Sequence, residues 1–193
     1  MTAPPTLPLC YPARPIDGGR HELASPKVGT WYAEPKINGW RTLVHAPSGT
    51  MWNRHGKLLS IAGEFSRALA ELAESPHEWF DCEGLERRHA IGKGALIVLD
   101  LPASALPYEE RNRLLQGTFC PLLGGVQGAV HSIPSFTNAA ATYALLQEDN
   151  RHVFRGVEFY EGIVMKRHGS LYPRQRLSPE RATGDWIKHR WAF

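Results

Sequence analysis

The residues best suited to chemistry lie in the octapeptide EPKINGWR, residues 34–41, whose lysine could attack a nucleotide phosphate. A free lysine has a pKa of about 10.4, so a lysine nucleophile needs desolvation or nearby cations to release its proton. One cation, Arg41, is close to Lys36 in sequence. The dipeptide Asn38-Gly39 favours a tight turn. We therefore expect Lys36 to end one strand and Arg41 to begin the next, with both side chains facing one cleft.

Taken alone, this octapeptide is equally typical of a hairpin turn with two solvated cations, because Asn-Gly between strand-forming residues is common. Four later segments favour the functional interpretation. Residues 80–85 (FDCEGL) place alternating carboxylates in a strand-like run, and residues 96–101 (LIVLDL) form a buried-strand pattern that contains another carboxylate. Residues 161–166 (EGIVMK) and 186–190 (WIKHR) add cations that the fold could gather around the first lysine.

In this order, the segments resemble the motifs of the covalent nucleotidyltransferases, which include ATP-dependent DNA ligases, RNA ligases and mRNA capping enzymes. The resemblance spans about residues 31 to 190, nearly the whole chain. Lys36 matches the lysine that accepts the nucleotide as a phosphoramide in the pattern K-x-D-G-x-R. Asn38 stands in place of the usual aspartate, while Gly39 and Arg41 are intact.

The same resemblance implies roles in nucleotide binding. Glu34 occupies the position that helps to recognise adenine in ligases. Arg54 lies in a segment similar to S/T-R-x-G, whose arginine approaches the sugar and phosphate of the nucleotide or the 5′-phosphate of the nucleic acid. Glu83 matches the acid of D-G-E, which is expected to hold the ribose. Leu99 falls where the family usually has an aromatic residue, with Asp100 after it.

Phosphate and metal chemistry is implied for the last two motifs. Glu161 and Lys166 match E-G-x-V-x-K, and Lys188 matches the first lysine of W-x-K-x-K, with Arg190 in place of the second. The resemblance implies that Lys166 and Lys188 neutralise the α-phosphate of ATP. It also implies that Glu161, with Asp100, helps to bind Mg²⁺ directly or through water.

Three departures from the family pattern have chemical consequences. Asn38 keeps a hydrogen-bonding side chain but lacks the charge of aspartate, so the nucleophile is tuned differently. Leu99 lacks a π-face for adenine, so base affinity is weaker or comes from another ring such as Trp31 or Trp40. Arg190 preserves positive charge and adds a fork suited to phosphate oxygens.

Composition indicates one globular domain over residues 1–193, because the length suits one domain and a 42% hydrophobic content suffices for a core. Without an apolar run of membrane length or a signal peptide, we expect a cytoplasmic protein with no membrane partner. The three cysteines are widely spaced and the nine histidines lack paired ligand spacing, which indicates reduced thiols and no zinc site.

Basic charge is concentrated near the C-terminal end. Residues 151–193 contain nine Lys or Arg against four Asp or Glu, whereas residues 1–150 contain thirteen against fifteen. Such a segment is either a solvated basic face or a surface for phosphates, because cation–phosphate contacts dominate nucleic-acid affinity. The candidates for contact with a polynucleotide backbone are Arg167, Arg174, Arg176 and Arg181.

Local patterns predict an α+β protein. Residues 1–28 are rich in proline and glycine and are expected to be irregular. Helical patterns cover residues 65–73, 107–115 and 137–147, and strand patterns cover most of the segments between them. The resemblance implies two antiparallel β-sheets with flanking helices and a nucleotide cleft between them, an ATP-grasp-like ligase adenylation domain.

The leading functional hypothesis is an ATP-dependent ligase that seals nicked DNA through a lysyl-AMP intermediate. The helix at residues 107–115 resembles one found in DNA ligases, which favours this branch. The alternatives are joining of RNA ends and a non-catalytic nucleotide-binding or nucleic-acid-binding module. DNA ligases and capping enzymes usually continue into an OB-fold domain, which these residues do not provide. We expect a monomer. It would act either as the nucleotidyltransferase core alone or with a partner protein in place of the OB-fold domain.

Overall fold

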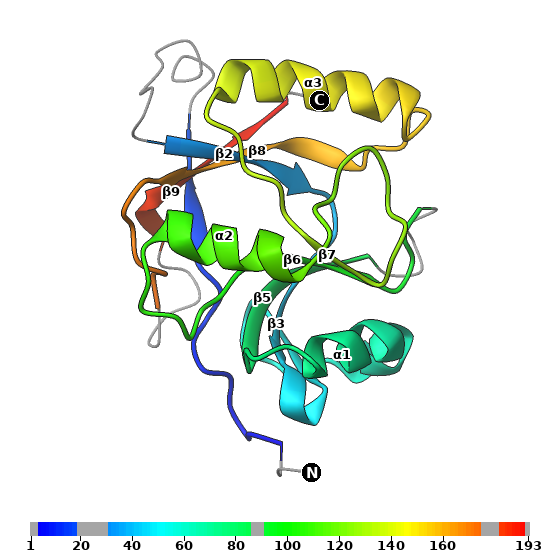
Figure 1. Ribbon diagram of the computed structural model, residues 1–193, viewed down its shortest axis with the longest axis vertical. Coiled ribbons are helices and arrows are strands. Elements are labelled where there is room, and N and C mark those ends of the chain that lie inside the picture. The colour runs from blue at the N-terminus through cyan, green and yellow to red at the C-terminus, as the bar shows by residue number, and fades with distance from the viewer. Residues whose placement is uncertain (1–3, 19–30, 86–90, 175–181, 192–193) are drawn as a thin grey trace.

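The computed structural model describes residues 4–18, 31–85, 91–174 and 182–191. Two β-sheets stack with helices around them (Figure 1). Each sheet is antiparallel except for one parallel pair at an edge, β1 with β9 and β6 with β7. The small sheet has the order β1 (Arg14–Asp17), β9 (Ala182–Arg190), β8 (Tyr160–Arg167), β2 (Trp31–Ile37), and the large sheet has the order β4 (Thr50–Asn53), β3 (Trp40–His45), β5 (Trp79–Leu85), β6 (Ala95–Asp100), β7 (Val130–Ser132).

Helices cover the outer faces of this arrangement. α3 (Ala139–His152) lies along β2 and β8, on the side of the small sheet that faces away from the large sheet (Figure 1). α2 (Tyr108–Thr118) packs against β6 and β7. α1 (Ser66–Ala73) packs at the opposite end of the molecule from α3, next to the short 3₁₀ helices η2 (Ala46–Ser48) and η3 (Ser60–Phe65).

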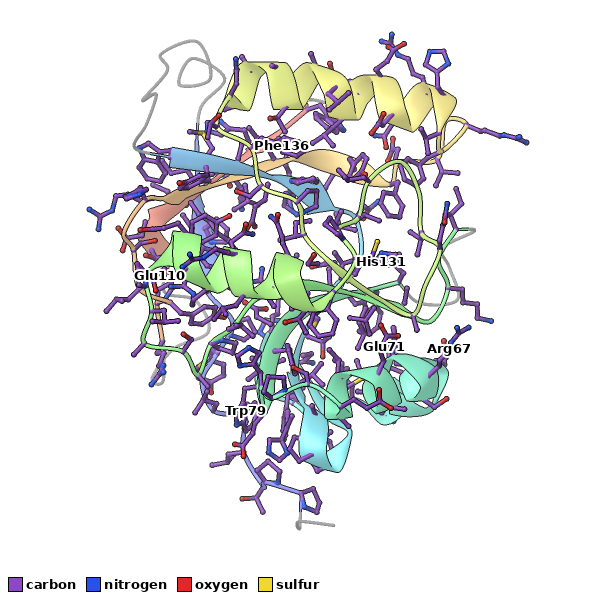
Figure 2. All side chains as sticks on the ribbon, in the orientation of Figure 1. Arg67, Glu71, Trp79, Glu110, His131 and Phe136 are labelled. Atoms are coloured by element: carbon purple, nitrogen blue, oxygen red, sulfur yellow. The ribbon has the colours of Figure 1, made fainter. Side chains whose placement is uncertain are left out.

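The amphipathic pattern of α1 determines how it packs on the large sheet. Its buried residues Ala68, Leu69 and Leu72 recur at helical spacing and join an apolar cluster with the strands. Arg67 and Glu71 lie on the exposed side of the helix (Figure 2). A second apolar cluster is formed by residues of α3, the small sheet and the large sheet. It includes Ile37, Leu85, Ile97, Leu146 and Ile163.

The Asn38-Gly39 turn joins the two sheets. β2 ends at Ile37 in the small sheet and β3 begins at Trp40 in the large sheet, so the two strands do not pair as a hairpin. Asn38 anchors the turn by donating from its Nδ2 to the carbonyl oxygen of Glu158, at 3.0 Å. Gly39 is required because a Cβ there would lie 2.9 Å from the backbone oxygen of Gly84 and 2.8 Å from the Glu83 side chain.

The α+β class and the two flanked sheets are confirmed, and three details differ. Residues 14–17 of the segment expected to be irregular form β1, because they pair with β9 far along the chain. Both sheets are mixed rather than wholly antiparallel. The last helix runs over Ala139–His152 instead of residues 137–147, and it is capped by Asn138, whose side chain accepts from the backbone N–H of Ala141. Within the described residues, no helix is long and apolar enough to span a bilayer.

Candidate functional site

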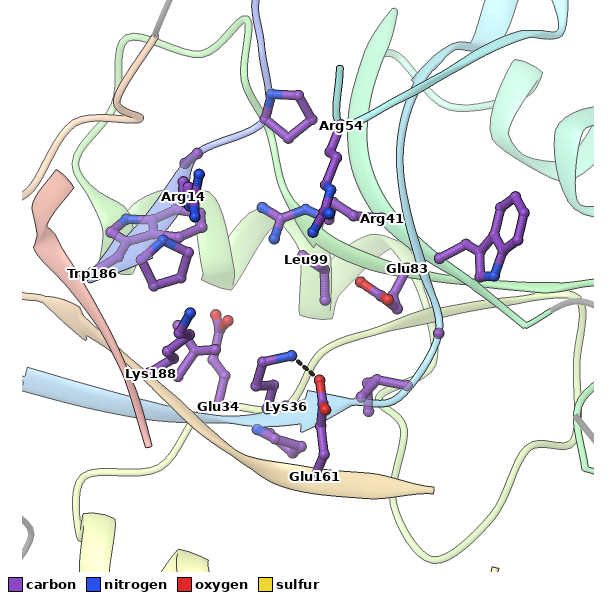
Figure 3. Close-up of a pocket in the computed structure, with 18 of the residues that line it drawn as sticks. Arg14, Glu34, Lys36, Arg41, Arg54, Glu83, Leu99, Glu161, Trp186 and Lys188 are labelled. Carbon is purple, nitrogen blue, oxygen red and sulfur yellow. Dashed lines mark hydrogen bonds and ion pairs between the residues drawn. The ribbon is translucent and has the colours of Figure 1, made fainter. Parts of the chain in front are cut away.

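A cavity of about 680 Å³ opens between the two sheets, within the size range of about 300–1,000 Å³ found for small-molecule sites (Figure 3). The three lysines predicted to be catalytic line it, and so do all predicted nucleotide-binding residues except Asn38. Of the two predicted metal ligands, Glu161 lines the cavity and Asp100 does not. The sequence motifs are therefore gathered at one place, with Lys36 and Arg41 in its walls as expected.

Lys36 donates from its Nζ to Glu161 Oε1, and this ion pair depends on an irregularity of the small sheet. Lys36 lies opposite Gly162, but the register then shifts, so that Ile37 lies opposite Tyr160. Glu161 is thus the extra residue of a β-bulge, which aims its carboxylate at the lysine. Both side chains remain partly exposed to the cavity.

The next residue in the chain, Gly162, brings β9 close to this pair. Its φ is 147°, and a Cβ here would overlap the backbone carbonyl oxygen of His189 on β9. Only glycine permits this approach. β9 then presents Lys188 and Arg190 to the cavity, with the Arg190 Nε 3.6 Å from Glu161 Oε2. The phosphate-binding cations predicted on β9 and the predicted nucleophile Lys36 thereby lie in one wall.

Lys166 lies at the floor of the cavity, with a side chain only 1% exposed. Its Nζ is 3.0 Å from Glu34 Oε2 and 3.1 Å from Asp100 Oδ2, and it donates to the carbonyl oxygen of Leu99 at 2.8 Å. It also lies 4.1 Å from the centre of the Trp186 ring. This cation is therefore compensated by two carboxylates within the protein.

The two carboxylates that flank Lys166 have opposite pKa shifts. Burial raises the pKa of Glu34, although the charge of Lys166 and a 2.6 Å hydrogen bond from Tyr108 oppose the shift. Burial also acts on Asp100, but Lys166 and Arg111 outweigh it and lower the pKa of that group. The Nε of Arg111 donates to Asp100 Oδ1 at 2.6 Å. Asp100 thus belongs to a buried ion network, and the structure does not bring it to the cavity as the predicted metal ligand.

The opposite wall is formed by the large sheet and carries Arg41 and Glu83. Arg41 donates through two nitrogens to Asp81, which also accepts a hydrogen bond from Tyr172. Burial raises the pKa of Glu83 to about 7, and the charges of Arg41 and Lys36 only partly offset this effect. Glu83 consequently changes its charge near neutral pH.

The predicted polynucleotide-binding arginines lie away from the cavity, where the structure describes them. Arg167 donates to Asp185 at 2.6 Å, and Arg174 donates to the carbonyl oxygens of Pro102 and Ala103. The other two candidates, Arg176 and Arg181, lie outside the described residues.

The two tryptophans suggested as adenine-stacking rings are placed differently. Trp31 is buried in the apolar cluster between the sheets and α3, and it does not line the cavity. Trp40 lines the cavity and is 38% exposed.

Three parts of the lining were not identified from the sequence. Val164 and Trp186 could have been found from strand alternation, because they lie two residues before Lys166 and Lys188 in their strands. The segment Pro12–Pro15 had no such pattern, since its place depends on long-range pairing with β9.

Solved DNA ligase structures share this architecture. The ligase domain of LigD from M. tuberculosis superposes with a TM-score of 0.68 at 18% identity, over 94% of this chain and 59% of that one. This chain has the fold of a DNA ligase domain. A mycobacterial DNA ligase D complexed with ATP and MES gives a TM-score of 0.62 at 22% identity, and Chlorella virus DNA ligase-adenylate gives 0.59 at 17%.

The ligase fold accounts for almost the whole of this chain, which in turn spans about three-fifths of the length of the LigD structures. No protein-family model matches the sequence, and no curated protein matches it either. The ligase likeness therefore rests on the fold.

Proposed function

We propose that this chain is the nucleotidyltransferase domain of an ATP-dependent polynucleotide ligase that seals nicked DNA through a lysyl-AMP intermediate. One observation carries the proposal: Lys36 stands in a cavity of nucleotide size, paired with Glu161 and faced by arginines, on a DNA ligase fold. A binding module could use the same amine to hold a phosphate, so covalent labelling of the protein separates the two functions.

The chemistry begins at the Lys36 Nζ, which in its neutral form attacks the α-phosphorus of ATP. The bond between the α-phosphorus and the oxygen of the β-phosphate breaks, pyrophosphate leaves, and the proton displaced from the amine passes to solvent. Phosphoryl transfer asks the protein mainly for alignment and charge neutralisation. Lys188 and Arg190 supply positive charge on the wall that carries the nucleophile. Because Lys166 is already compensated by Glu34 and Asp100, we assign it to fixing the cavity floor.

Mg²⁺ fits this site as a metal shared between protein and phosphates. Among the described residues, no cluster of three His, Cys, Asp or Glu side chains could hold an ion without other ligands. Mg²⁺ commonly binds through one or two carboxylates together with waters and substrate phosphates. Glu161 would hold it, and the ion would neutralise charge on the phosphates during transfer.

The nucleoside would lie against the other residues of the cavity. Glu83 would accept hydrogen bonds from the ribose, and Leu99 and Val164, which line the cavity from opposite sheets, would offer apolar surface to the base. Glu34 borders the same space, but Lys166 and Tyr108 engage both of its carboxylate oxygens, so we assign it no direct contact with the base. AMP would then pass to a 5′-phosphate, and a 3′-hydroxyl would displace it to seal the strand.

Incubation with α-labelled ATP and Mg²⁺ tests the proposal through covalent, acid-labile label on the protein. Lys36→Ala should abolish the label because alanine has no nucleophile, and Lys36→Arg should fail because guanidinium stays protonated. Lys93→Ala is the matched control, since Lys93 is exposed and does not line the cavity.

An unlabelled wild-type protein, or wild-type label in either Lys36 variant, would refute the assignment. Nicked DNA and nicked RNA substrates then separate the two kinds of strand joining.

A further inference from the structure

The N-terminal segment forms one side of the cavity. Residues Pro12–Pro15 are part of the lining, immediately before and within β1. The parallel pairing of β1 with β9 attaches this segment to the edge of the small sheet. A stretch rich in proline thereby becomes a defined wall of the site.

Two anchors fix this wall on either side of Arg14. The backbone N–H of Ala13 donates to the Tyr172 hydroxyl at 3.1 Å, and that hydroxyl donates to Asp81, the partner of Arg41. On the other side, Asp17 Oδ2 lies 3.0 Å from Lys188 Nζ. The segment is therefore connected through Tyr172 and Asp81 to Arg41 on one wall, and through Asp17 to Lys188 on the other.

Arg14 is an exposed residue of this anchored segment, and it lines the cavity. In Figure 3, Arg14, Arg41 and Arg54 lie on the side of the cavity opposite Lys36 and Glu161. A guanidinium held on a fixed backbone loses less freedom on binding than one on a mobile tail. Its planar fork also matches the oxygens of a phosphate group.

The charge of the cavity indicates a ligand with several negative charges. Lysines and arginines outnumber carboxylates among the described lining residues. Aspartates outside the lining pair with three of these cations, Arg41, Lys166 and Lys188. Glu161 and Glu34 are already engaged by Lys36 and Lys166, and Glu83 has a pKa raised to about 7 by burial. Arg14 and Arg54 add positive charge on the side of the cavity opposite Lys36, away from an α-phosphate bound between Lys36 and Lys188.

We propose that Arg14 is a phosphate-binding residue, which holds a phosphate group beyond the one that Lys36 attacks. This proposal rests on the proposed function for the identity of the ligand. The phosphate comes from the polyphosphate tail of a nucleoside triphosphate or from the 5′-phosphate of a nicked strand, which offer the same oxygens to the guanidinium.

The test measures non-covalent affinity in the full chain carrying Lys36→Ala, so that no turnover interferes. Calorimetric titration compares ATP with AMP, and fluorescence anisotropy compares nicked DNA bearing a 5′-phosphate with nicked DNA bearing a 5′-hydroxyl. Each titration is repeated after adding Arg14→Gln, Arg14→Lys or Arg113→Gln. Arg113 is the matched control, an exposed arginine of α2 outside the cavity lining.

Arg14→Gln should weaken binding of ATP at least about 10-fold and of AMP less than about 2-fold, or show the same contrast between the two nicks. Arg14→Lys should fall between Gln and Arg, because it keeps the charge and loses the fork. The role of Arg14 would be overturned by any of three results. Affinity could fall equally for both members of each ligand pair, it could fall equally in Arg113→Gln, or neither titration could show binding. Labelling of wild-type protein by α-labelled ATP reports on the proposed function separately.

Discussion

Replacing Lys166 with methionine should mainly lower the free energy of unfolding, with a smaller direct effect on the adenylation reaction. The substitution keeps a long apolar stem but removes a cation that lies 3.0 Å from Glu34 and 3.1 Å from Asp100. Breaking a buried ion pair by removing one partner typically costs about 3–5 kcal/mol, because the remaining charge is left uncompensated. Asp100 still has Arg111 as a partner, so the loss falls mainly on Glu34, and we expect the lower end, about 3 kcal/mol.

The pH dependence identifies the origin of that loss. Burial already raises the pKa of Glu34, and removal of Lys166 raises this pKa further because its charge opposes the shift. An acid with a raised folded-state pKa is neutral at low pH and loses stability as pH rises through that pKa. The cost of Lys166→Met should therefore be smaller at about pH 5 than at about pH 8, where a buried charge would be unpaired.

Urea unfolding followed by tryptophan fluorescence, at both pH values, measures this cost. In a thermal scan, a loss of about 3 kcal/mol corresponds to a fall in Tm of about 6–12 °C for a chain of this length. Adding Glu34→Gln should recover part of the loss, giving a coupling of about 1–3 kcal/mol in a double-mutant cycle. Wild-type stability of Lys166→Met at both pH values, with adenylation abolished, would show that Lys166 acts on the phosphate instead.

Three further predictions concern the cavity and the nucleic acid. Glu161→Ala should slow adenylation by roughly 100-fold or more, with partial rescue by excess Mg²⁺ or Mn²⁺ in single-turnover assays; no rescue would argue against a metal role. The kcat/KM for adenylation should rise as pH passes about 7, where Glu83 ionises, and this inflection should vanish in Glu83→Gln. Arg174→Glu should weaken nick binding and its dependence on salt while leaving Lys36 labelling near wild type, and normal nick sealing by this variant would move the nucleic-acid surface elsewhere.

Strand alternation and turn chemistry predicted much of the architecture. The turn after Lys36 and the alternating acids of β5 gave correct strands, and Lys36, Arg41 and Glu83 line the cavity, whereas Asp81 is buried behind it. The placement of Asp100 could not be obtained in this way. Its motif position is compatible with a metal site, but its partner Arg111 lies on α2, and only tertiary packing brings the two together.

Two other features depend on contacts between distant parts of the chain. The parallel pairing of β1 with β9 joins the two ends of the chain, and no local pattern in residues 14–17 announces it. The bulge at Glu161 also leaves no trace in hydrophobic alternation, because one extra residue shifts the side-chain period locally. The sequence does mark the bulge through Gly162, the residue after Glu161, which must be glycine because the backbone of His189 approaches it closely.

The arrangement divides the proposed reaction between two sheets. The proposed nucleophile Lys36 belongs to the small sheet, whereas the proposed ribose ligand Glu83 belongs to the large one. They are joined by a two-residue crossing and by the buried contact of Lys166 on β8 with Asp100 on β6. Because misplacement by about 1 Å can cost roughly 100-fold in rate, we expect this contact to matter for the position of the amine relative to the nucleotide. A Lys166 variant that folds should accordingly bind ATP and still transfer AMP slowly, because its sheets are no longer held in register across the cleft.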